Sequence, residues 1–325
     1  MTVSVRDDEL APAKVNLYLH VTGRREDGYH ELDSLVAFAD IGDRLHAEPA
    51  GALSLRVEGP KAGALAQERD NLVLTAAERL RREFDVTAGA ALVLHKTLPV
   101  AAGLGGGSAD AAAALRLLGR LWSLMPCPDR LHRLGLELGA DVPVCLRGEP
   151  MRMQGIGDVL QPLASFPALP VVLANPGVPL ATPAVFRHTS ARSPAARWPG
   201  PGFSDPGALI VFLAGCRNDL QDAAMQLAPE VAGVVAALAR EDGCLLARMS
   251  GSGASCFGLF ADDAAARQAE AGLRAAHPAW WVAAGRGAWP DERPPASDAT
   301  AGAVVGWLCG FGSQSFREPE SQRVV

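Results

Sequence analysis

A glycine-rich segment at residues 96–110 carries the strongest chemical signal in the sequence. It reads KTLPVAAGLGGGSAD, with four glycines within five positions from Gly103 to Gly107. Glycine lets a backbone approach an anion closely, and the N–H groups at the start of a following helix can hold phosphate oxygens. The segment therefore predicts a polyphosphate-binding loop. A flexible turn before a helix is the alternative, because one glycine-rich stretch is a weak signal.

Two familiar phosphate-binding motifs do not fit this segment. A Walker A loop has Lys after its last glycine, and a dinucleotide fingerprint has a third glycine there, but this chain has Ser108. Residues 96–99 also do not read as the end of a buried strand. Both motifs are disfavoured.

A second glycine-rich segment, residues 249–257 (MSGSGASCF), precedes an expected strand in the second half. Neither Ser252 nor Ser255 has the flanking glycines of a nucleophile elbow, which disfavours hydrolase chemistry. Taken alone, the segment predicts a tight turn. Beside the first loop, it could close a nucleotide site from another lobe.

The elements that position these loops alternate between strand-like and helix-like patterns, which favours an α/β or α+β architecture. Strands are expected at residues 15–21, 52–57, 91–94, 169–174 and 256–260. Helices are expected at residues 71–84, 109–122, 229–240 and 264–276. Ser108 is expected to cap the second helix.

The pattern divides the chain into two lobes, at residues 1–165 and 166–285. Residues 189–207 are rich in Pro, Gly, Ser and Arg and are expected to form an exposed, mobile insertion. Residues 286–325 are expected to be a poorly ordered extension.

Composition excludes several classes of protein. The 325 residues include 34 Gly and 24 Pro, 49% are hydrophobic, and the net charge of −6 argues against a general nucleic-acid binder. The longest apolar runs, residues 208–216 and 231–239, are too short to cross a bilayer.

The first ten residues lack the apolar core of a secretory signal, so a cytoplasmic location is expected. Six dispersed cysteines and seven histidines show no metal-site spacing, so we expect reduced thiols and no structural zinc.

Several motifs in order resemble the GHMP superfamily, the small-molecule kinases named after galactose, homoserine, mevalonate and phosphomevalonate. They are residues 12–17 (PAKVNL), the loop at 99–110, and residues 250–254 (SGSGA). Residues 28–32 (GYHEL), 139–143 (GADVP) and 175–177 (NPG) are similar to one branch, which phosphorylates a cytidylated methylerythritol of the non-mevalonate isoprenoid pathway. The resemblance spans residues 11–284. It departs at Ala101, where many relatives have Gly, and after Gly285, where they have no counterpart.

The resemblance implies a two-lobed α+β fold, within the broader α/β class. The N-terminal lobe would be an ATP-binding kinase lobe similar to the second domain of ribosomal protein S5. The C-terminal lobe would be ferredoxin-like, with the active site between the two lobes. It further implies a monomer or weak homodimer whose partner is a small-molecule substrate, with no nucleic acid and no membrane.

The resemblance also assigns the catalytic residues. Asp141 would be the base that accepts the hydroxyl proton, and Lys14 would keep it ionised and oriented. Without the resemblance, Asp141 would read as a turn residue and Lys14 as a solvated lysine. Asn16, on the same strand face as Lys14, would hold the acceptor hydroxyl.

The remaining roles concern the two substrates. Tyr29 and His30 would bind the cytidine end, and Thr182 and Phe186 would form a second platform. ATP would lie against Asn71, Lys96, Pro99, Val100, Ala101, Ala102, Gly103, Leu104, Gly105, Gly106, Gly107, Ser108 and Ala109. The chemistry requires Mg²⁺, but no acidic pair identifies its ligands, so the metal site is unassigned.

Two rival interpretations remain open. A sibling kinase of the homoserine or mevalonate type would share the loop, and Tyr29 and His30 are the residues that argue against it. A non-catalytic nucleotide-binding regulator could keep the loop but lose the base or the lysine. Both Lys14 and Asp141 are present, which favours an enzyme.

Overall fold

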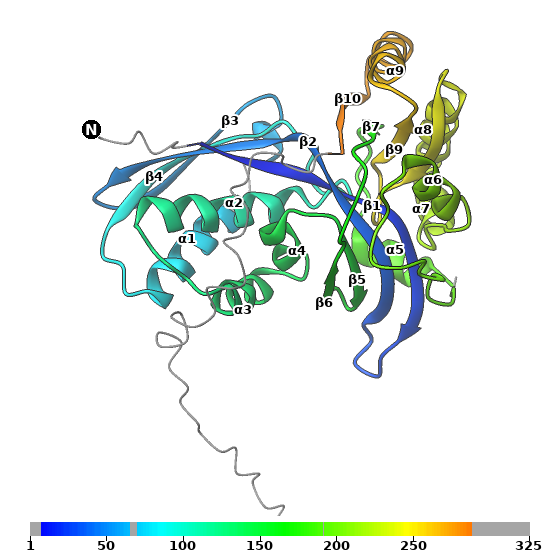
Figure 1. The fold of residues 1–325 in the computed structure, drawn as a ribbon. Coiled ribbons are helices and arrows are strands. Elements are labelled where there is room, and N and C mark those ends of the chain that lie inside the picture. Colours follow the sequence, from blue (N-terminus) through cyan, green and yellow to red (C-terminus); the bar gives the residue numbers. More distant parts are fainter. Residues whose placement is uncertain (1–7, 66–69, 191, 288–325) are drawn as a thin grey trace, which may run out of the picture. The chain divides into compact units, whose positions relative to one another are not determined.

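A computed structural model describes residues 8–65, 70–190 and 192–287 (Figure 1). Its first sheet is built around a long antiparallel hairpin of β1 (Asp8–Arg24) and β2 (His30–Ala50). The other strands are β3 (Leu53–Glu58), β4 (Gly89–His95), β5 (Met151–Gly155) and β6 (Val159–Pro162). The order is β3-β4-β2-β5-β6, with β1 paired to β2 and only the β3–β4 pair parallel.

Helices pack along one face of this sheet (Figure 1). They are α1 (Leu72–Glu83), α2 (Gly106–Leu121), α3 (Pro128–Leu138) and α4 (Val142–Arg147), with a short 3₁₀ turn at Ala62–Leu65. The central helix, α2, is buried along most of its length. Its run of alanines from Ala111 to Ala114 favours helix and lets the sheet and α1 approach closely. A rigid helix therefore begins directly at the end of the glycine loop.

The second sheet has the order β10-β7-β9-β8. Its strands are β7 (Pro170–Asn175), β8 (Cys244–Met249), β9 (Cys256–Phe260) and β10 (Trp281–Arg286). With α8 (Glu230–Arg240) and α9 (Asp263–Ala276), the chain runs β-α-β-β-α-β, and the predicted ferredoxin-like arrangement is confirmed. Helices α5 (Thr182–His188), α6 (Pro206–Ala214) and α7 (Gln221–Leu227) are inserted between β7 and α8.

Strand β1 continues from the first sheet into contact with the second lobe. The Leu19 N–H donates to the Arg217 carbonyl at 3.0 Å, and the Asp219 N–H donates to the Leu19 carbonyl at 2.8 Å. The buried Arg248 guanidinium donates to the carbonyls of Leu17, Leu213 and Cys216. These contacts fix β1 where the two lobes meet, so its side chains reach both.

Each predicted strand and helix has a counterpart in the structure, with ends shifted by a few residues. The elements that were not predicted are β2, β5, β6, β8, β10, α3, α4, α6 and α7. The expected cap of α2 is wrong. Helix α2 starts at Gly106, with Gly105 at the cap in the left-handed conformation (φ 63°), and Ser108 lies inside the first turn. A glycine in this conformation ends the loop earlier than a serine cap would, which leaves the first N–H groups of the helix without side-chain acceptors.

The expectation for residues 189–207 is wrong in one respect. The segment is irregular until α6 begins at Pro206, but it is anchored at several points rather than lying free. The Ala196 N–H donates to the buried Asp33 carboxylate at 2.6 Å, and Ser193 Oγ donates to the buried Asp219 carboxylate at 2.9 Å. Phe203 is buried in the apolar core. Its partners are Asp33 on β2, the turn at Asp219 and the apolar core.

The predicted division into residues 1–165 and 166–285 stays a prediction, although the first sheet ends at Pro162 and the second starts at Pro170. Most of the predicted extension, residues 288–325, lies outside the described residues. Among the residues that the structure describes, no helix is both long and apolar enough to span a membrane.

Candidate functional site

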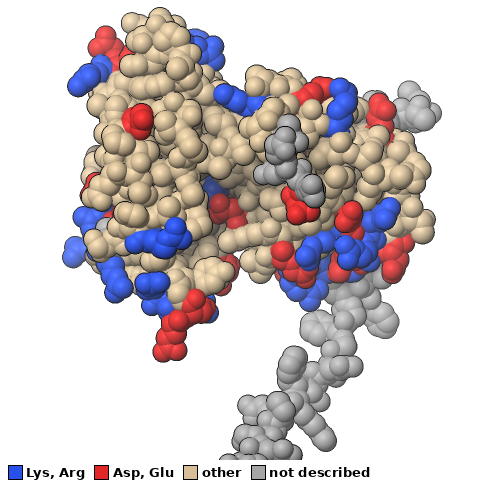
Figure 2. Space-filling model, turned by 180° about the vertical axis from the view of Figure 1, so that it is seen from behind, with Lys and Arg blue, Asp and Glu red and all other residues tan. Residues whose placement is uncertain are grey.

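The predicted site residues surround a cleft lined by segments from both lobes; Figure 2 shows a hollow between them with charged side chains at its wall. Its volume is about 310 Å³, at the lower end of the range of pockets that bind small molecules. The lining comes from β1, the two glycine-rich segments, and the starts of α4 and α5. It includes Lys14, Asn16, Ala101, Ala102, Gly103, Gly105, Gly106, Gly107, Ser108, Asp141, Thr182, Phe186, Gly251 and Ser252.

An ion pair lies in this cleft. Lys14 on β1 is buried, and its Nζ lies 2.8 Å from Oδ2 of Asp141, whose side chain is 36% exposed. Asp141 directly precedes α4, yet its carboxylate caps no N–H of that helix. The carboxylate is therefore held by the ammonium on one side and open to the cleft on the other. This arrangement suits a base that stays ionised and accepts a proton from a ligand.

Asn16 lies two residues from Lys14 on the same strand. Its Nδ2 donates to Ser34 Oγ at 2.8 Å, and its backbone N–H donates to Ser250 Oγ at 3.1 Å. Its Oδ1 is buried with no hydrogen-bond partner in the structure, and Asn16 lines the cleft. A buried acceptor without a partner is costly, so a ligand hydroxyl donating to this oxygen would be favoured.

The two glycine-rich segments pack against each other. Ser250 Oγ donates to the Gly103 carbonyl at 3.0 Å, and the Ser255 N–H donates to the Ala102 carbonyl at 3.0 Å. A Cβ added to Gly103 would lie 2.4 Å from the Ser250 carbonyl oxygen, and φ is +75° there, so only glycine fits. The second segment thus closes the first from the C-terminal lobe, as the sequence suggested.

The glycine loop also contacts the catalytic candidate directly. The Lys14 N–H donates to the Leu104 carbonyl at 2.9 Å. A Cβ on Gly105 would lie 3.1 Å from Lys14 Cε. The loop, the start of α2 and the Lys14 side chain therefore hold one another in place.

A second buried lysine, Lys96, ties together the two ends of the loop. Its Nζ lies 2.6 Å from Asp43 Oδ2 and 2.5 Å from Asp110 Oδ2, and all three side chains are almost fully buried. Asp43 Oδ1 also accepts from the N–H groups of Thr97 and Leu98. Asp43 therefore holds the beginning of the loop, while Asp110 lies in α2, just after the first turn that follows the loop.

The charge balance of this triad shifts two pKa values. Burial alone would lower the pKa of the Lys96 ammonium, but the two carboxylates outweigh it and raise that pKa. Burial raises the pKa of Asp110 to about 7, with Lys96 opposing the shift and Asp43 adding to it. Asp110 Oδ1 has no partner. Lys96 was predicted to contact ATP, but its ammonium is already committed to two carboxylates.

The remaining predicted nucleotide residues divide into two groups. A hollow beside the loop is lined by Asn71, Lys96, Pro99, Val100, Ala101, Gly106 and Gly107. Asn71 Oδ1 caps α1 by accepting from the Val73 N–H at 2.9 Å. Leu104 and Ala109, in contrast, are buried in apolar clusters and line neither hollow.

The predicted acceptor residues lie together at the other end of the cleft. Tyr29, His30, Thr182 and Phe186 line a hollow that also contains Asp141. His30 packs against Phe186 with ring centroids 5.0 Å apart and the ring planes tilted by 33°. Burial lowers the pKa of His30, and Arg24 and Arg192 lower it further. Tyr29 is 63% exposed. The aromatic wall formed by His30 and Phe186 therefore lines the same hollow as Asp141, the candidate base.

Sequence reasoning missed the residues that hold this site from behind. Asn218 Nδ2 donates to the carbonyls of Met249 and Gly251, which fixes the second glycine segment. Ser34 holds Asn16, and Asp43 and Asp110 hold Lys96. The only signal in the sequence was the polar residue at position 110, directly after the glycine motif.

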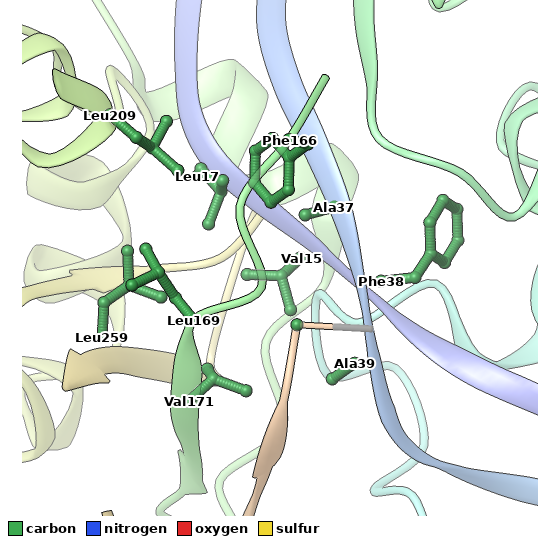
Figure 3. Close-up of a pocket in the computed structure, with 11 residues that line it drawn as sticks. Val15, Leu17, Ala37, Phe38, Ala39, Phe166, Leu169, Val171, Leu209 and Leu259 are labelled. Carbon is green, nitrogen blue, oxygen red and sulfur yellow. The ribbon is translucent and has the colours of Figure 1, made fainter. Parts of the chain in front are cut away.

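A smaller pocket lies away from these groups. It is lined by side chains such as Val15, Phe38, Phe166, Val171 and Leu259, all of them apolar, as Figure 3 shows. With no donor, acceptor or charge in its lining, it offers no group for catalysis.

Replacement of Asp110 by Asn tests the charge state of the triad. The pKa of the Asp110 carboxyl is about 7 in the folded protein, against an ordinary value of 3.8. Between these two pH values the folded state therefore binds more protons than the unfolded state. As a result, the free energy of unfolding falls as the pH rises through this window. Asn cannot titrate. We expect the stability of Asp110→Asn relative to the unmodified protein to rise by more than about 1 kcal/mol from pH 4 to pH 8.

Chemical denaturation at several pH values measures this difference. Asp129→Asn is the matched control, because it is the same carboxyl-to-amide change at an exposed position at the start of α3, outside the triad. A constant offset between Asp110→Asn and the unmodified protein would show that Asp110 does not titrate in this window.

Comparison with known proteins supplies independent evidence. Residues 71–149 match the GHMP kinases N terminal domain, and residues 207–279 match the GHMP kinases C terminal domain. A solved structure of mevalonate kinase from L. major in complex with R-mevalonate has a TM-score of 0.63 at 18% identity, over 87% of this chain and 96% of that one. This likeness concerns the fold alone.

Closer similarity is found within one group of these kinases. The 4-diphosphocytidyl-2-C-methyl-D-erythritol kinase of Cereibacter sphaeroides is 56% identical over 86% of this chain and 98% of its own length. A solved 4-(cytidine 5'-diphospho)-2C-methyl-D-erythritol kinase has a TM-score of 0.69 at 37% identity, covering 86% of this chain and 98% of that one. The chain therefore belongs to the 4-diphosphocytidyl-2-C-methyl-D-erythritol kinase family of GHMP kinases.

Proposed function

We propose that this protein transfers the γ-phosphoryl group of ATP to the 2-hydroxyl of 4-diphosphocytidyl-2-C-methyl-D-erythritol. This step belongs to the non-mevalonate isoprenoid pathway, and we place it in the cytoplasm. The observation that carries the proposal is the Lys14–Asp141 pair, 2.8 Å apart, in the same cleft as the glycine loop. Family membership supports the choice of acceptor.

Asp141 is the base in this proposal. As the acceptor oxygen bonds to the γ-phosphorus, the bond from that phosphorus to the β,γ-bridging oxygen breaks and ADP leaves. The hydroxyl proton passes to the Asp141 carboxylate. The Lys14 ammonium, held at Oδ2, keeps the carboxylate ionised until then and orients its open oxygen toward the cleft.

The glycine loop binds the phosphates of ATP. The N–H groups at the start of α2 have no intrahelical acceptor, and the positive end of the helix dipole favours the negative charge there. Ser108, in the first turn, adds a hydroxyl in the lining of the cleft. Few charged side chains are needed, because backbone groups supply most of the contacts.

Mg²⁺ fits this site only as a partner of the nucleotide. No cluster of three acidic, His or Cys side chains occurs in the described part of the chain, while phosphate oxygens and water suit this ion well. When bound, it would neutralise phosphate charge. Ser108 and the open oxygen of Asp141 are the protein groups in the cleft that could contact it.

The acceptor would span the hollow from the aromatic wall to the base. Tyr29 and the His30–Phe186 pair would hold the cytosine, with Thr182 between them and Asp141. Asn16 Oδ1, lacking a partner, would accept a hydrogen bond from a hydroxyl of the erythritol unit. This arrangement needs no residue beyond those already in the cleft.

Replacement of Asp141 by Asn tests the base. We expect kcat to fall by about 10²-fold to 10⁴-fold, because Asn cannot accept the proton. The binding constant for ATP should change little, since the loop is untouched. Single-turnover kinetics and calorimetry with ATP measure the two effects, and Asp129→Asn serves as the matched control. Turnover near that of the unmodified protein would refute the role of Asp141.

Replacement of Gly105 by Ala tests the coupling between the loop and Lys14. A Cβ would lie 3.1 Å from Lys14 Cε at a residue with φ +63°, a backbone conformation that costs about 1–2 kcal/mol for Ala. We expect a loss of kcat/KM of at least about tenfold, as that strain corresponds to a factor near ten.

Gly119→Ala, in the same helix with open space around its Cα, is the control and should retain full activity. Comparison of kcat/KM and melting temperature for the two variants separates a local effect from unfolding. Equal activity in Gly105→Ala and Gly119→Ala would contradict the coupling.

A panel of acceptors tests the substrate and both rivals. A coupled assay for ADP should show turnover with the cytidylated methylerythritol and little with homoserine or mevalonate. Tyr29→Ala should raise KM for the acceptor and leave KM for ATP unchanged, because Tyr29 is exposed and does not line the two hollows that contain the glycines of the loop. Equal turnover of homoserine or mevalonate would identify a sibling kinase. ATP binding with no turnover of any acceptor would identify a regulator.

A further inference from the structure

A separate hollow lies on the other side of the His30–Phe186 wall. Its lining includes Val21 and three arginines, Arg24, Arg187 and Arg192. They come from the end of β1, the last turn of α5 and the anchored insertion. We call this hollow the arginine pocket.

The arginine pocket is distinct from the catalytic cleft. The two share Gly28, His30, Pro183 and Phe186, so the stacked rings act as a partition. Tyr29 and Asp141 line only the catalytic side. In the proposed function, the acceptor lies on the side that Tyr29 and Asp141 line. None of the three arginines lines that side.

The backbone around the pocket is firmly held. The Ser193 N–H donates to the Val21 carbonyl at 3.0 Å, and Ser193 Oγ donates to the buried Asp219 carboxylate. Thr189 Oγ1 donates to the Asp219 carbonyl at 3.0 Å. Arg192 is thus attached to a segment tied at both sides to β1 and to the Asp219 turn. Hydrogen bonds therefore hold the backbone around the pocket, while the arginine side chains are exposed to solvent.

The charges of this pocket are not balanced by the chain. No Asp or Glu is among the described residues that line it, and none of the three arginines forms a salt bridge with the described part of the chain. Arg24 Nε only donates to the Gly28 carbonyl at 3.3 Å. Three positive charges therefore line one hollow with no carboxylate among the lining residues, and a small anion would be attracted there.

We propose that the arginine pocket is a second anion site that binds a phosphate or diphosphate group of a small molecule. Guanidinium groups match such oxyanions because they donate paired hydrogen bonds in a plane. The ligand is distinct from both ATP at the glycine loop and the acceptor at Asp141. Because His30 and Phe186 face both hollows, occupancy of the pocket supports the wall against which the acceptor base stacks.

Calorimetry with inorganic pyrophosphate tests the proposal. The full-length protein is first saturated with a non-hydrolysable ATP analogue, which removes the glycine loop as a competing site. We expect one further pyrophosphate site. The double variant Arg187→Gln with Arg192→Gln should weaken it at least about tenfold, a loss of about 1.4 kcal/mol. Both arginines are exposed, so the fold should be retained, and melting curves check this.

Arg25→Gln is the matched control, because Arg25 lies on the same hairpin but pairs with Asp27 and does not line the pocket. It should leave pyrophosphate binding unchanged. Inorganic phosphate and malonate are the other probes. Binding of phosphate as tight as that of pyrophosphate supports a site for a single phosphate, and weaker binding supports a diphosphate site.

Three results would overturn the proposal. They are equal pyrophosphate binding by the double variant and Arg25→Gln, malonate binding as tight as that of pyrophosphate, and no pyrophosphate binding at millimolar concentration. None of these readouts depends on turnover. Failure of the arginine pocket would therefore leave the proposed kinase activity untouched, and failure of the kinase assay would leave the pocket untouched.

Discussion

The buried ammonium of Lys96 is the interaction on which the rest of the site depends. It joins Asp43 on β2 to Asp110 on α2, while Lys96 itself follows β4. One side chain thus closes the glycine loop at both ends. Removing one member of a buried pair typically costs 3–5 kcal/mol, because the remaining charge stays desolvated. The backbone N–H groups of the loop are useful only if their directions are fixed, and the triad fixes them.

Two buried lysines beside the same loop have opposite tasks. Lys96 is almost fully buried together with both of its carboxylates, and its ammonium is committed to them. The partner of Lys14 is Asp141, whose side chain is 36% exposed. The Asp141 carboxylate therefore contacts the Lys14 ammonium and is also open to the cleft. The difference in exposure, rather than residue type, separates a structural ion pair from a chemical one. The family resemblance predicts that Lys96 lies beside the nucleotide, but the sequence alone does not show that Asp43 and Asp110 bind its ammonium.

Local patterns predicted what depends on neighbours in sequence. The amphipathic helices α1, α8 and α9 and the short buried strands β7 and β9 follow from spacing, and the motifs identified the catalytic candidates. Contacts between distant residues could not be read in the same way. The Asn16 N–H bonds to Ser250, 234 positions away, and Asp33 anchors Ala196 across 163 positions. The insertion at residues 189–207 was expected to be mobile because it is rich in turn-forming residues. Its anchors, the buried Asp33 and Asp219, lie elsewhere in the chain.

The β1–β2 hairpin explains how one element serves both lobes. Lys14 and Asn16 lie where β1 crosses the junction, while Gly28 and His30, at the far end of the hairpin, line both the hollow with Asp141 and the arginine pocket. A rigid antiparallel ladder fixes the spacing between these two groups. The chain carries a net charge of −6, yet the hairpin contributes to an arginine pocket with no carboxylate in its lining. Average charge therefore excludes binding of a polyanionic chain, whereas the local arrangement of cations decides whether a single small anion can bind.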